Sequence, residues 1–368
     1  MSKRVTYKFD EVIYDDTKRG TKIKKENYLK EGKHPIIDQG KELIAGYYDI
    51  DDGLYTDTPA IIFGDHTRII KYIDSPFFLG ADGVKILKTK YNNIDYKYLY
   101  YFFLKNEVPD TGYNRHFKWL KEIDIFIPPL DVQKKIAKTL DTVSELFAMR
   151  KQQLAELDNL IKSVFYDMFG DPVTNEKGWT IKTVNEVCKK IIGGGTPSKN
   201  NKDYFKGSIP WVTPKDMKNV VINDSIDYIT EAAIENSSAK LIPKKSVLMV
   251  IRSGILKKLL PVAINTVDVT INQDMKAFIP NDEVSAEYLL YFFITVQNVL
   301  LNNVRSVTAD NIEFNLIKTL GIPCPPIKLQ NKFSTIATKI EVQKSLVKKS
   351  IEETQLLFDS LMSQYFDE

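Results

Sequence analysis

The chain has 368 residues, with 43% hydrophobic and 27% charged residues, which is typical of a soluble globular protein with two or three domains. No run of about 18 or more apolar residues occurs, which excludes a membrane-spanning helix, and the first residues show no signal-peptide pattern. The net charge of +3 and the pI of about 8.4 are too mild to identify a nucleic-acid-binding protein on their own. The only cysteines, Cys188 and Cys324, belong to no metal-binding motif, so we expect a cytoplasmic protein without zinc.

Residues 1–127 are expected to form a first globular domain of mixed helix and strand. The short apolar run Ala60-Ile61-Ile62-Phe63 predicts a buried strand. The aromatic segment 96–104 is long enough for a core helix. Its rings are contiguous, so we expect them to pack in the core and not to stack on nucleic-acid bases, which would require separate exposed rings in a basic groove.

Residues 128–170 carry the pattern of a long coiled-coil helix. Pro128-Pro129 is compatible with a helix start, and Asp171-Pro172 is expected to end the helix, because a residue before proline is pushed out of the helical region. The helix should then have about 40 residues and a length of roughly 60 Å. Apolar residues recur at alternating steps of four and three, which is the period of a coiled-coil seam. This first seam consists of Ile136, Leu140, Val143, Phe147, Leu154, Leu157, Ile161 and Val164.

Residues 171–322 are expected to form a second globular domain. Ser246–Ile251 predicts a buried strand, and the aromatic segment 286–294 predicts a second core helix. The triplet Gly193-Gly194-Gly195 lies beside hydroxyl groups and a lysine. It could bring backbone N–H groups close to phosphate or form an ordinary flexible turn, and both interpretations stay open. It lacks the spacing of a nucleotide-binding loop.

The second half of the chain repeats the first. Pro128-Pro129 with Gln133 recurs as Pro325-Pro326 with Gln330, at an offset of 325 − 128 = 197 that holds to the chain end. The repeat predicts a C-terminal helix within residues 323–368, and the two helices can bury both seams by pairing with each other. The second seam consists of Phe333, Ile340, Val347, Ile351, Phe358 and Leu361.

Upstream, the repeat weakens. Tyr98 matches Tyr288 at an offset of 288 − 98 = 190, and the same offset carries Arg115 onto Arg305. The additional seven residues of the second copy are then placed between Arg305 and the Pro-Pro pair. Residues 1–60 and 172–245 no longer match visibly. This pattern indicates a duplicated scaffold whose globular parts diverged to recognise different things.

The motifs of the second half identify a family resemblance. Gly194-Gly195-Thr196-Pro197-Ser198, the segment from Ile209-Pro210-Trp211-Val212-Thr213-Pro214 to Met217, and the Pro-Pro-x-x-x-Gln openings of both helices resemble the specificity subunit of Type I restriction–modification systems. The resemblance covers essentially the whole chain. The first unit departs from the pattern, because it opens with Pro35-Ile36-Ile37-Asp38-Gln39-Gly40-Lys41 in place of the Gly-rich loop and lacks a Trp-Val-Thr-Pro equivalent.

The resemblance implies an α+β fold in which two mixed α/β target recognition domains are separated by two long antiparallel coiled-coil helices in a pseudo-twofold tandem repeat. The expected segments are target recognition domain 1 (1–127), the central helix (128–170), target recognition domain 2 (171–322) and the C-terminal helix (323–368). Each domain would read one half of a bipartite target in double-stranded DNA, and the helix pair would set the spacer between the halves and dock partner subunits.

The resemblance also implies that this chain is not an enzyme. Its partners would be two modification subunits, which bind S-adenosylmethionine and methylate adenine, and two restriction–translocation subunits, which bind ATP and Mg²⁺. The sequence has no methyltransferase motif, no phosphate-binding loop and no Cys/His cluster, so no cofactor of its own is expected.

Candidate DNA contacts are polar and basic residues in segments expected to be loops, since such side chains contact phosphates and base edges. In the first domain they are Gln39, Lys41, His66, Thr67, Arg68, Asn114, Arg115 and His116. In the second domain they are Ser198, Lys199, Asn200, Lys215, Arg252, Ser253, Lys257, Lys258, Asn272, Gln273 and Arg305. Arg115 and Arg305 rank above the others because the repeat aligns them.

Two other classes of protein stay open at this point. One is an enzyme that fuses restriction and methylation to a recognition half, which is disfavoured because the chain starts directly with a recognition unit. It predicts methyl transfer by the chain alone. The other is a coiled-coil adaptor whose globular ends bind protein. It predicts no sequence-dependent binding to DNA even with a methyltransferase partner present.

Overall fold

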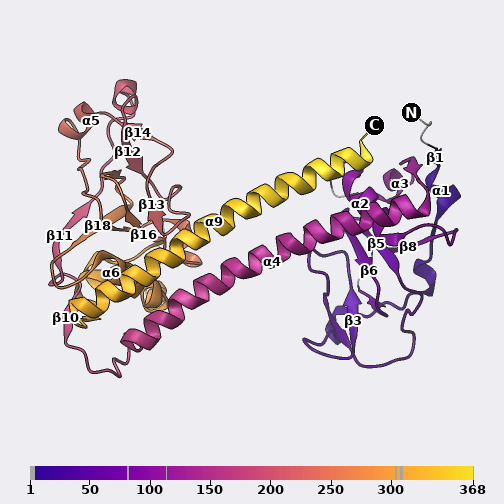
Figure 1. The fold of residues 1–368 in the computed structure, drawn as a ribbon, viewed down its shortest axis with the longest axis horizontal. Helices are drawn as coiled ribbons and strands as arrows, with labels where there is room; N and C mark the ends of the chain where they lie inside the picture. The colour runs from indigo at the N-terminus through magenta and orange to yellow at the C-terminus, as the bar shows by residue number, and fades with distance from the viewer. Residues whose placement is uncertain (1–4, 81–82, 113, 303–304, 307–309, 368) are drawn as a thin grey trace. The chain divides into compact units, whose positions relative to one another are not determined.

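The computed structural model describes residues 5–80, 83–112, 114–302, 305–306 and 310–367 (Figure 1). The chain divides into two compact units. The first contains residues 1–151 and 349–368, and the second contains residues 152–348. The division cuts through both long helices, because the two ends of each helix pack against different globular domains. The units are described one at a time below.

The described part of the first unit contains a four-stranded sheet, a three-stranded sheet, a separate pair of strands and three short helices, besides its parts of the two long helices. The larger sheet has the order β2 (Ile13–Asp15), β8 (Val84–Thr89), β5 (Ala60–Gly64), β6 (Ile70–Ile73), and the smaller has the order β4 (Gly46–Tyr48), β3 (His34–Ile37), β7 (Phe78–Leu79). Strands β1 (Thr6–Tyr7) and β9 (Ile125–Phe126) form a separate pair, and the helices are α1 (Phe9–Val12), α2 (Tyr96–Lys105) and α3 (Phe117–Leu120), with 3-10 turns η1 (Thr17–Arg19) and η2 (Lys25–Asn27). The predicted strand at 60–63 is confirmed as β5, and the predicted core helix at 96–104 as α2.

The second unit has the same components with some additions. Its larger sheet has the order β11 (Cys188–Gly193), β18 (Met275–Pro280), β15 (Val247–Val250), β16 (Val262–Asn265), β13 (Val221–Ile222), and its smaller sheet has the order β14 (Tyr228–Ile229), β12 (Ile209–Val212), β17 (Thr270–Ile271). Two further pairs are β10 (Ile181–Thr183) with β21 (Gly321–Pro323) and β19 (Arg305–Ser306) with β20 (Asp310–Asn311). The helices are α5 (Glu231–Glu235), α6 (Ala286–Thr295), α7 (Gln297–Leu301) and α8 (Phe314–Thr319), with 3-10 turns η3 (Lys202–Phe205) and η4 (Gly254–Lys257). The strand predicted at 246–251 and the helix predicted at 286–294 are confirmed as β15 and α6.

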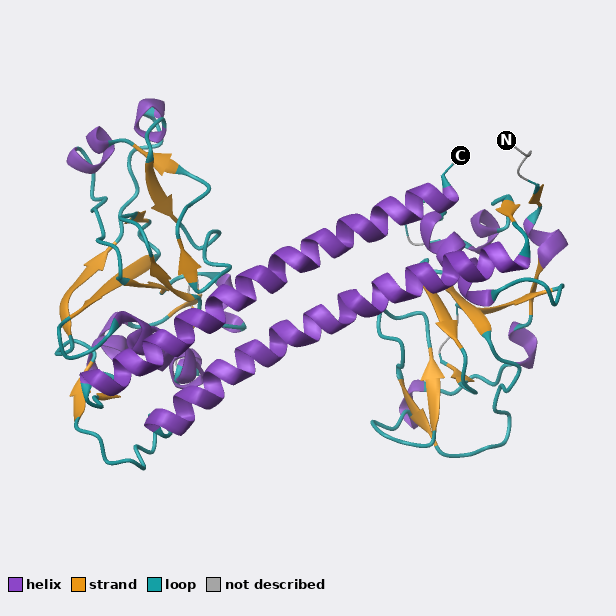
Figure 2. Ribbon diagram, viewed as in Figure 1, coloured by secondary structure: helices purple, strands orange, loops and turns teal. Residues whose placement is uncertain are grey.

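The two domains share one strand topology, which extends the repeat into the parts where the sequences no longer match. The order β2-β8-β5-β6 corresponds to β11-β18-β15-β16, and β4-β3-β7 corresponds to β14-β12-β17. In both smaller sheets the central strand pairs antiparallel on one side and parallel on the other. Figure 2 shows that the strands of each domain are short and are joined by extended loops.

This correspondence corrects one expectation about the first unit. Ile36 and Ile37 pair with Phe78 and Leu79 in the same way as Trp211 and Val212 pair with Thr270 and Ile271. Pro35-Ile36-Ile37 is therefore the equivalent of Pro210-Trp211-Val212, not a replacement for the Gly-rich loop. The shared proline was the available signal, and the change from tryptophan to isoleucine concealed it.

Each large sheet is covered on both faces. In the first unit Ile61 and Phe63 of β5 point to a core shared with α2, while Ala60 and Ile62 point to a core shared with the smaller sheet. In the second unit, alternate residues of β15 divide in the same way between two cores. Because neither face is left to water, these strands read as continuous apolar runs. Tyr98 and Tyr288 are fully buried, which confirms the prediction that the aromatic segments are core.

The long helices are α4 (Leu130–Phe169) and α9 (Ile327–Phe366), each of 40 residues as expected (Figure 1). The helix α4 ends at Phe169, one residue earlier than expected from Asp171-Pro172. Gly170 has φ +77, and its N–H donates to the carbonyl of Tyr166 at 2.8 Å. A glycine in the left-handed conformation is a common helix terminator, so Gly170 is the stop signal and Pro172 follows it.

Within each unit α4 and α9 run side by side in opposite directions. In the first unit Arg150 bonds to the Ser350 carbonyl and the Thr354 hydroxyl. In the second unit Asp158 pairs with Lys344 at 2.6 Å. The predicted seam residues of both helices are all buried or half-buried: Ile136, Leu140, Val143, Phe147, Leu154, Leu157, Ile161, Val164, Phe333, Ile340, Val347, Ile351, Phe358 and Leu361.

Polar side chains interrupt the seam and limit the registers that it allows. Lys344 is almost fully buried and is held by Asp158 and by Glu341, each at 2.6 Å. Sliding either helix by one turn would separate Lys344 from Asp158, its partner on the other helix. Glu341 on the same helix would stay in place, but the loss of one of the two partners of a buried charge is costly. Polar groups at seam positions are a known means of fixing register in coiled coils.

A buried glutamine joins each long helix to the globular domain of its unit. Gln133 accepts the N–H of Asp95 at 2.8 Å and donates to the carbonyl of Pro128 at 2.7 Å. Gln330 accepts the N–H of Ser285 at 2.9 Å and donates to the carbonyl of Pro325 at 2.8 Å. Asp95 and Ser285 are the N-cap residues of α2 and α6. We call each of these arrangements a glutamine clamp. It ties the start of the core helix to the start of the long helix.

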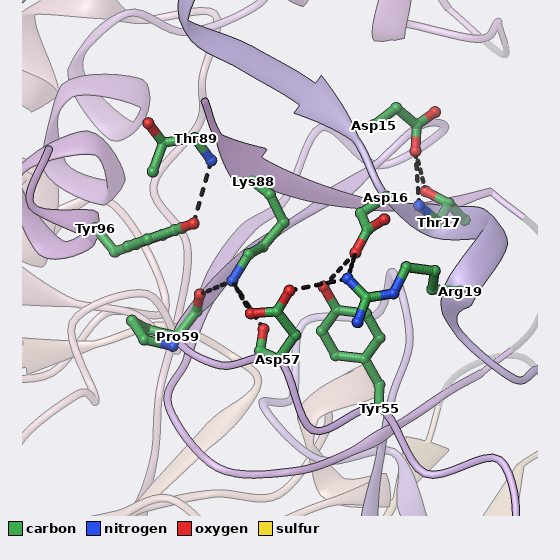
Figure 3. Close-up of polar contacts among 10 residues, drawn as sticks. All are labelled: Asp15, Asp16, Thr17, Arg19, Tyr55, Asp57, Pro59, Lys88, Thr89 and Tyr96. Carbon is green, nitrogen blue, oxygen red and sulfur yellow. Dashed lines mark hydrogen bonds and ion pairs between the residues drawn. The ribbon is translucent and has the colours of Figure 1, made fainter. Parts of the chain in front are cut away.

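The first domain also contains a polar network on the side of β8 (Figure 3). Lys88 is buried and donates to the side chain of Asp57 and to the carbonyl of Pro59, each at 2.9 Å. Arg19 pairs with both Asp57 and Asp16, and the hydroxyl of Tyr55 donates to Asp16 at 2.7 Å. This network ties the turn after β2 and the loop 55–59 to the sheet, and burial together with the nearby Asp16 carboxylate raises the pKa of Tyr55.

Replacing a clamp glutamine should destabilise its unit. Gln133→Ala removes the partner of the half-buried N–H of Asp95 and of the buried carbonyl of Pro128, at about 1–3 kcal/mol for a fully buried group. We expect a lower midpoint of urea unfolding monitored by circular dichroism. Gln152→Ala is the matched control, because Gln152 lies on the same helix but is exposed, and its amide donates to Glu156, which is also exposed. Equal unfolding midpoints for the two variants would contradict the role assigned to the clamp.

Candidate nucleic-acid interface

Most of the sequence-predicted contact residues lie at three turns that are equivalent in the two domains. The exceptions are Asn114, Arg115 and His116, which precede α3, Ser198, Lys199 and Asn200, which precede η3, and Arg305 in β19. The three turns are the one that follows β3 or β12, the one that follows β5 or β15, and the one that precedes β8 or β18. In each domain they lie at one end of the sheets, because β5 and β8 are antiparallel neighbours, as are β15 and β18. Residues far apart in the chain therefore meet at one edge, which we call the turn edge of each domain.

In the first domain three separate segments are bonded together at the turn edge. The side chain of Gln39 accepts the N–H of His66 at 3.1 Å, and the carbonyl of Gln39 accepts the hydroxyl of Thr67 at 2.7 Å. The ring of His66 lies 3.2 Å from the carbonyl of Asn114. These residues were predicted as contacts from separate segments of the sequence, and the fold brings the segments together. Lys41 and Arg115 are exposed nearby in the chain.

Two first-domain candidates have partners that give them a supporting role in this structure. Arg68 has φ 62 and donates to the Val108 carbonyl at 3.2 Å and to Asp110 at 2.6 Å. His116 is 1% exposed, and its ring lies 3.1 Å from the Asp65 carbonyl. His116 therefore cannot reach DNA without movement of the loop, and its position indicates that it holds that loop against the turn after β5.

In the second domain the turn edge is organised around one carboxylate, Asp274. Arg252 contacts Asp274 through Nε at 2.7 Å and through Nη2 at 2.6 Å. The amides of Asn272 and Gln273 donate to the other oxygen of Asp274 at 3.1 and 3.3 Å. Thr196 donates to the side-chain oxygen of Gln273. Asp274 and Thr196 were not among the predicted contacts, although Asp274 directly follows two residues that were.

The glycine triplet has a packing role that neither sequence-based interpretation anticipated. A Cβ on Gly194 would lie 1.8 Å from the Asn272 carbonyl oxygen, and one on Gly195 would lie 2.3 Å from the Ser238 carbonyl carbon. The N–H of Gly195 donates to Ile271 at 2.9 Å. The glycines allow the loop to lie directly against the turn edge. The N–H groups of Gly194 and Gly195 are used inside the protein and not held for phosphate.

The remaining second-domain candidates are mostly exposed. Ser253 instead caps η4 and is half-buried, and Asn272 is 7% exposed. The exposed residues are Ser198, Lys199, Asn200, Lys215, Lys257, Lys258 and Gln273. Exposed lysines around a polar edge are the distribution expected where phosphates are contacted. The assignment of single residues to DNA stays a prediction.

The alignment of Arg115 with Arg305 is corrected by the fold. The N–H of His116 donates to the Asp65 carbonyl, and the N–H of Ile312 donates to the Ile251 carbonyl, at equivalent places after β5 and β15. The offset here is already 312 − 116 = 196. Six of the seven additional residues therefore precede Ile312, and Arg115 corresponds to Asn311. The side chain of Arg305 lies outside the described residues.

No group of three or more His, Cys, Asp or Glu side chains among the described residues is placed to hold a metal ion. Burial raises the pKa of the Cys188 thiol to about 12, so this thiol is not a reactive thiolate. None of the described helices is both long and apolar enough to cross a bilayer.

Comparison with known proteins shows the family to which this chain belongs. The family described as "Type I restriction modification DNA specificity domain" matches residues 1–159 and 176–355, once for each half of the repeat. The chain belongs to this family. It is 33% identical over 339 residues to the specificity subunit of the type I restriction enzyme EcoR124I/EcoR124II of Escherichia coli, covering 87% of this chain and 82% of that protein.

Solved structures support the fold of this specificity subunit. The type I restriction–modification S subunit from M. genitalium matches all of this chain and 98% of its own, with a TM-score of 0.68 at 16% identity. A chain from a structure of type I system assembly and conformational transition matches 98% of this chain and 97% of its own, with a TM-score of 0.57 at 16% identity. The chain is thus a DNA-specificity subunit with two tandem specificity domains, which confirms the family resemblance and the α+β fold class.

Glycine replacements can test the turn edge of the first domain. Gly83 has φ +88, and a Cβ there would lie 2.8 Å from the ring of His66 and 3.0 Å from the amide of Gln39. Gly83→Ala should therefore displace both side chains and weaken DNA binding by the assembled complex. Gly112→Ala is the matched control, because Gly112 has φ +79 but a Cβ added there would meet nothing within 4 Å among the described residues.

Both substitutions introduce the same left-handed strain, of about 1–2 kcal/mol. Only Gly83→Ala adds the collision at the turn edge. Electrophoretic mobility shifts with target DNA should show a larger loss for Gly83→Ala than for Gly112→Ala. Equal losses would mean that the contacts of His66 and Gln39 do not contribute to binding.

Proposed function

We propose that each domain of this specificity subunit reads one half of a bipartite DNA target with its turn edge, and that α4 and α9 set the spacer between the halves. The observation that carries the proposal is the shared strand topology with different side chains at the same edge. A common scaffold would present each edge to DNA in the same manner, while the different residues would select different sequences.

The division of labour within each edge follows from side-chain chemistry. Exposed lysines such as Lys41, Lys199 and Lys215 would contact phosphates and set the position on the duplex. Side chains that can form two hydrogen bonds at once would approach base edges, Gln39 and Asn114 through a donor and an acceptor and Arg252 through two donors. Tying these side chains to neighbouring turns lowers the entropy lost on binding.

We further propose that the chain is non-catalytic and works in the cytoplasm inside a larger complex. Two modification subunits would bring S-adenosylmethionine and methylate adenine, and two restriction–translocation subunits would bring ATP and Mg²⁺. Apolar side chains left exposed along the long helices support a docking role. They include Val132, Met149 and Leu160 on α4 and Val342, Leu346 and Leu356 on α9.

Co-expression with the modification subunits of the same system tests the function. Mapping of methylated adenines across the host genome should give one motif with two defined halves and a fixed unread spacer. The purified chain alone with S-adenosylmethionine and DNA should transfer no methyl groups. Methyl transfer by the chain alone, or methylation without a bipartite motif, would refute the proposal.

The helix pair can be tested by lengthening it. Seven residues inserted after Leu157 in α4, and seven after Val347 in α9, keep Arg150 opposite Thr354 and Asp158 opposite Lys344. One heptad adds roughly 10 Å of helix, which corresponds to about three base pairs of DNA. We expect the methylation motif to keep both halves and to gain about three base pairs of spacer.

A change in either half of the motif, with the spacer unchanged, would contradict the role given to α4 and α9. The single insertion after Leu157 is the control. It displaces the seam of α4 by one heptad against an unchanged α9, and it should reduce methylation because Lys344 then loses Asp158.

A further inference from the structure

We propose that Arg252 reads a guanine in the half-site of the second domain, and that Asp274 is the positioning residue that sets the guanidinium for this contact. The inference rests on the proposed function, because it specifies what one turn edge recognises. It assigns different tasks to two neighbouring residues, of which one contacts the base and the other acts through the first.

The backbone fixes the place of both residues. Arg252 follows β15 and Asp274 precedes β18, and these strands are antiparallel neighbours. The carbonyl of Asp274 accepts the N–H of Ile251 at 2.9 Å and the N–H of Arg252 at 3.2 Å. The two turns are therefore joined through their backbones as well as through the ion pair. A side chain on a backbone that is fixed in this way can be held in one orientation.

The way in which Asp274 holds Arg252 leaves the base-reading edge available. A single carboxylate oxygen, Oδ1, accepts from both Nε and Nη2 of Arg252. A guanidinium has five N–H donors, and this contact occupies the side that carries Nε. With respect to the described residues, the opposite side, formed by Nη1 and the second hydrogen of Nη2, keeps two parallel donors. Two parallel donors match the O6 and N7 acceptors of guanine in the major groove.

Exposure and charge agree with this division. The side chain of Arg252 is 50% exposed and that of Asp274 is 22% exposed, so the arginine is the more accessible member of the pair. A carboxylate without a positively charged partner would weaken DNA binding, because it would repel the phosphates. Asp274 instead pairs with Arg252 through one oxygen, and its second oxygen accepts hydrogen bonds from the amides of Asn272 and Gln273.

At the equivalent positions of the first domain, other residues stand in place of Arg252 and Asp274. His66 stands where Arg252 stands, two residues beyond the last equivalent strand position. The equivalent of Asp274 is Gly83, whose carbonyl accepts the N–H of Asp65 in the way that Asp274 accepts Ile251. Glycine has no carboxylate, so the first domain holds His66 with Gln39 and Asn114 instead. Different chemistry at one structural position is expected if that position reads sequence.

The test uses the complex with its modification subunits and maps methylated adenines genome-wide. The wild-type motif should contain a guanine in the half-site read by the second domain. Arg252→Ala should relax the preference for that guanine by about ten-fold or more, and Asp274→Ala should relax the same position. The first half-site and the spacer should stay unchanged in both variants.

Asp282→Ala is the matched control. Asp282 lies just beyond the opposite end of β18, is highly exposed, and pairs with Lys189 at 2.8 Å. Its loss should leave the whole motif unchanged. If Asp274→Ala prevents folding, Asp274→Leu, which has a similar shape without acceptors, replaces it.

The double variant Arg252→Ala with Asp274→Ala separates positioning from general stability. If Asp274 acts through Arg252, the double variant should be no more relaxed than Arg252→Ala alone. A wild-type motif without that guanine, or an unchanged motif in Arg252→Ala, overturns the assignment of Arg252. An unchanged motif in the folded Asp274 variant overturns the role of Asp274. Absence of any bipartite motif with the wild-type chain would instead refute the proposed function itself.

Discussion

The glutamine clamp is the contact on which the arrangement of each unit depends. One buried amide satisfies the start of the core helix and the start of the long helix at the same time, in both copies. The core helix lies on the large sheet, so fixing it against the long helix also fixes the sheet. A buried amide with all its groups paired has few alternative positions, because moving it would leave polar groups unsatisfied. The turn edge of each domain therefore has a defined position relative to the long helix that the clamp joins to that domain.

The clamp also explains where the two copies were free to diverge. Gln133 and Gln330 lie at the end of each domain that contacts the long helices, together with the buried tyrosines Tyr98 and Tyr288, which both donate to carbonyls just ahead of the Pro-Pro pairs. The turn edges lie away from these contacts. Substitutions there leave the contacts of the clamp in place. This separation of a constant part from a variable part suits a protein whose two domains read different sequences.

Much of this organisation was predictable from the sequence, and the reasons are physical. The heptads, the Pro-Pro starts and the aromatic helices have strong periodic signals, and the structure confirms the helices and strands predicted from them. The repeat was not visible in residues 1–60 and 172–245, because strand pairing depends on which face is buried and tolerates many residues. Ile36 can stand for Trp211 in a buried strand, and no local signal marks the equivalence.

Individual edge residues were harder to assign. The sequence identified Arg252, Asn272 and Gln273 as candidates but did not identify Asp274, because an acidic residue is not expected at a DNA-binding edge until its partner is known. It ranked Arg115 with Arg305 by a gapless offset, and the additional residues near α7 made that alignment wrong. It also selected His116, which is buried. Partner identity and burial are properties of the folded chain, and spacing alone does not contain them.

The first unit has one consequence for the order of events during synthesis. Its core includes Met362 and Phe366 of α9, and Lys105 bonds to Ser363, which lies 258 positions further along the chain. A ribosome completes all the strands of this unit long before it makes those residues. Until they emerge, the faces of Tyr98 and Phe102 that Phe366 covers stay open to water. The second unit, residues 152–348, has no such delay. The domain that is translated first is therefore the one that finishes folding last.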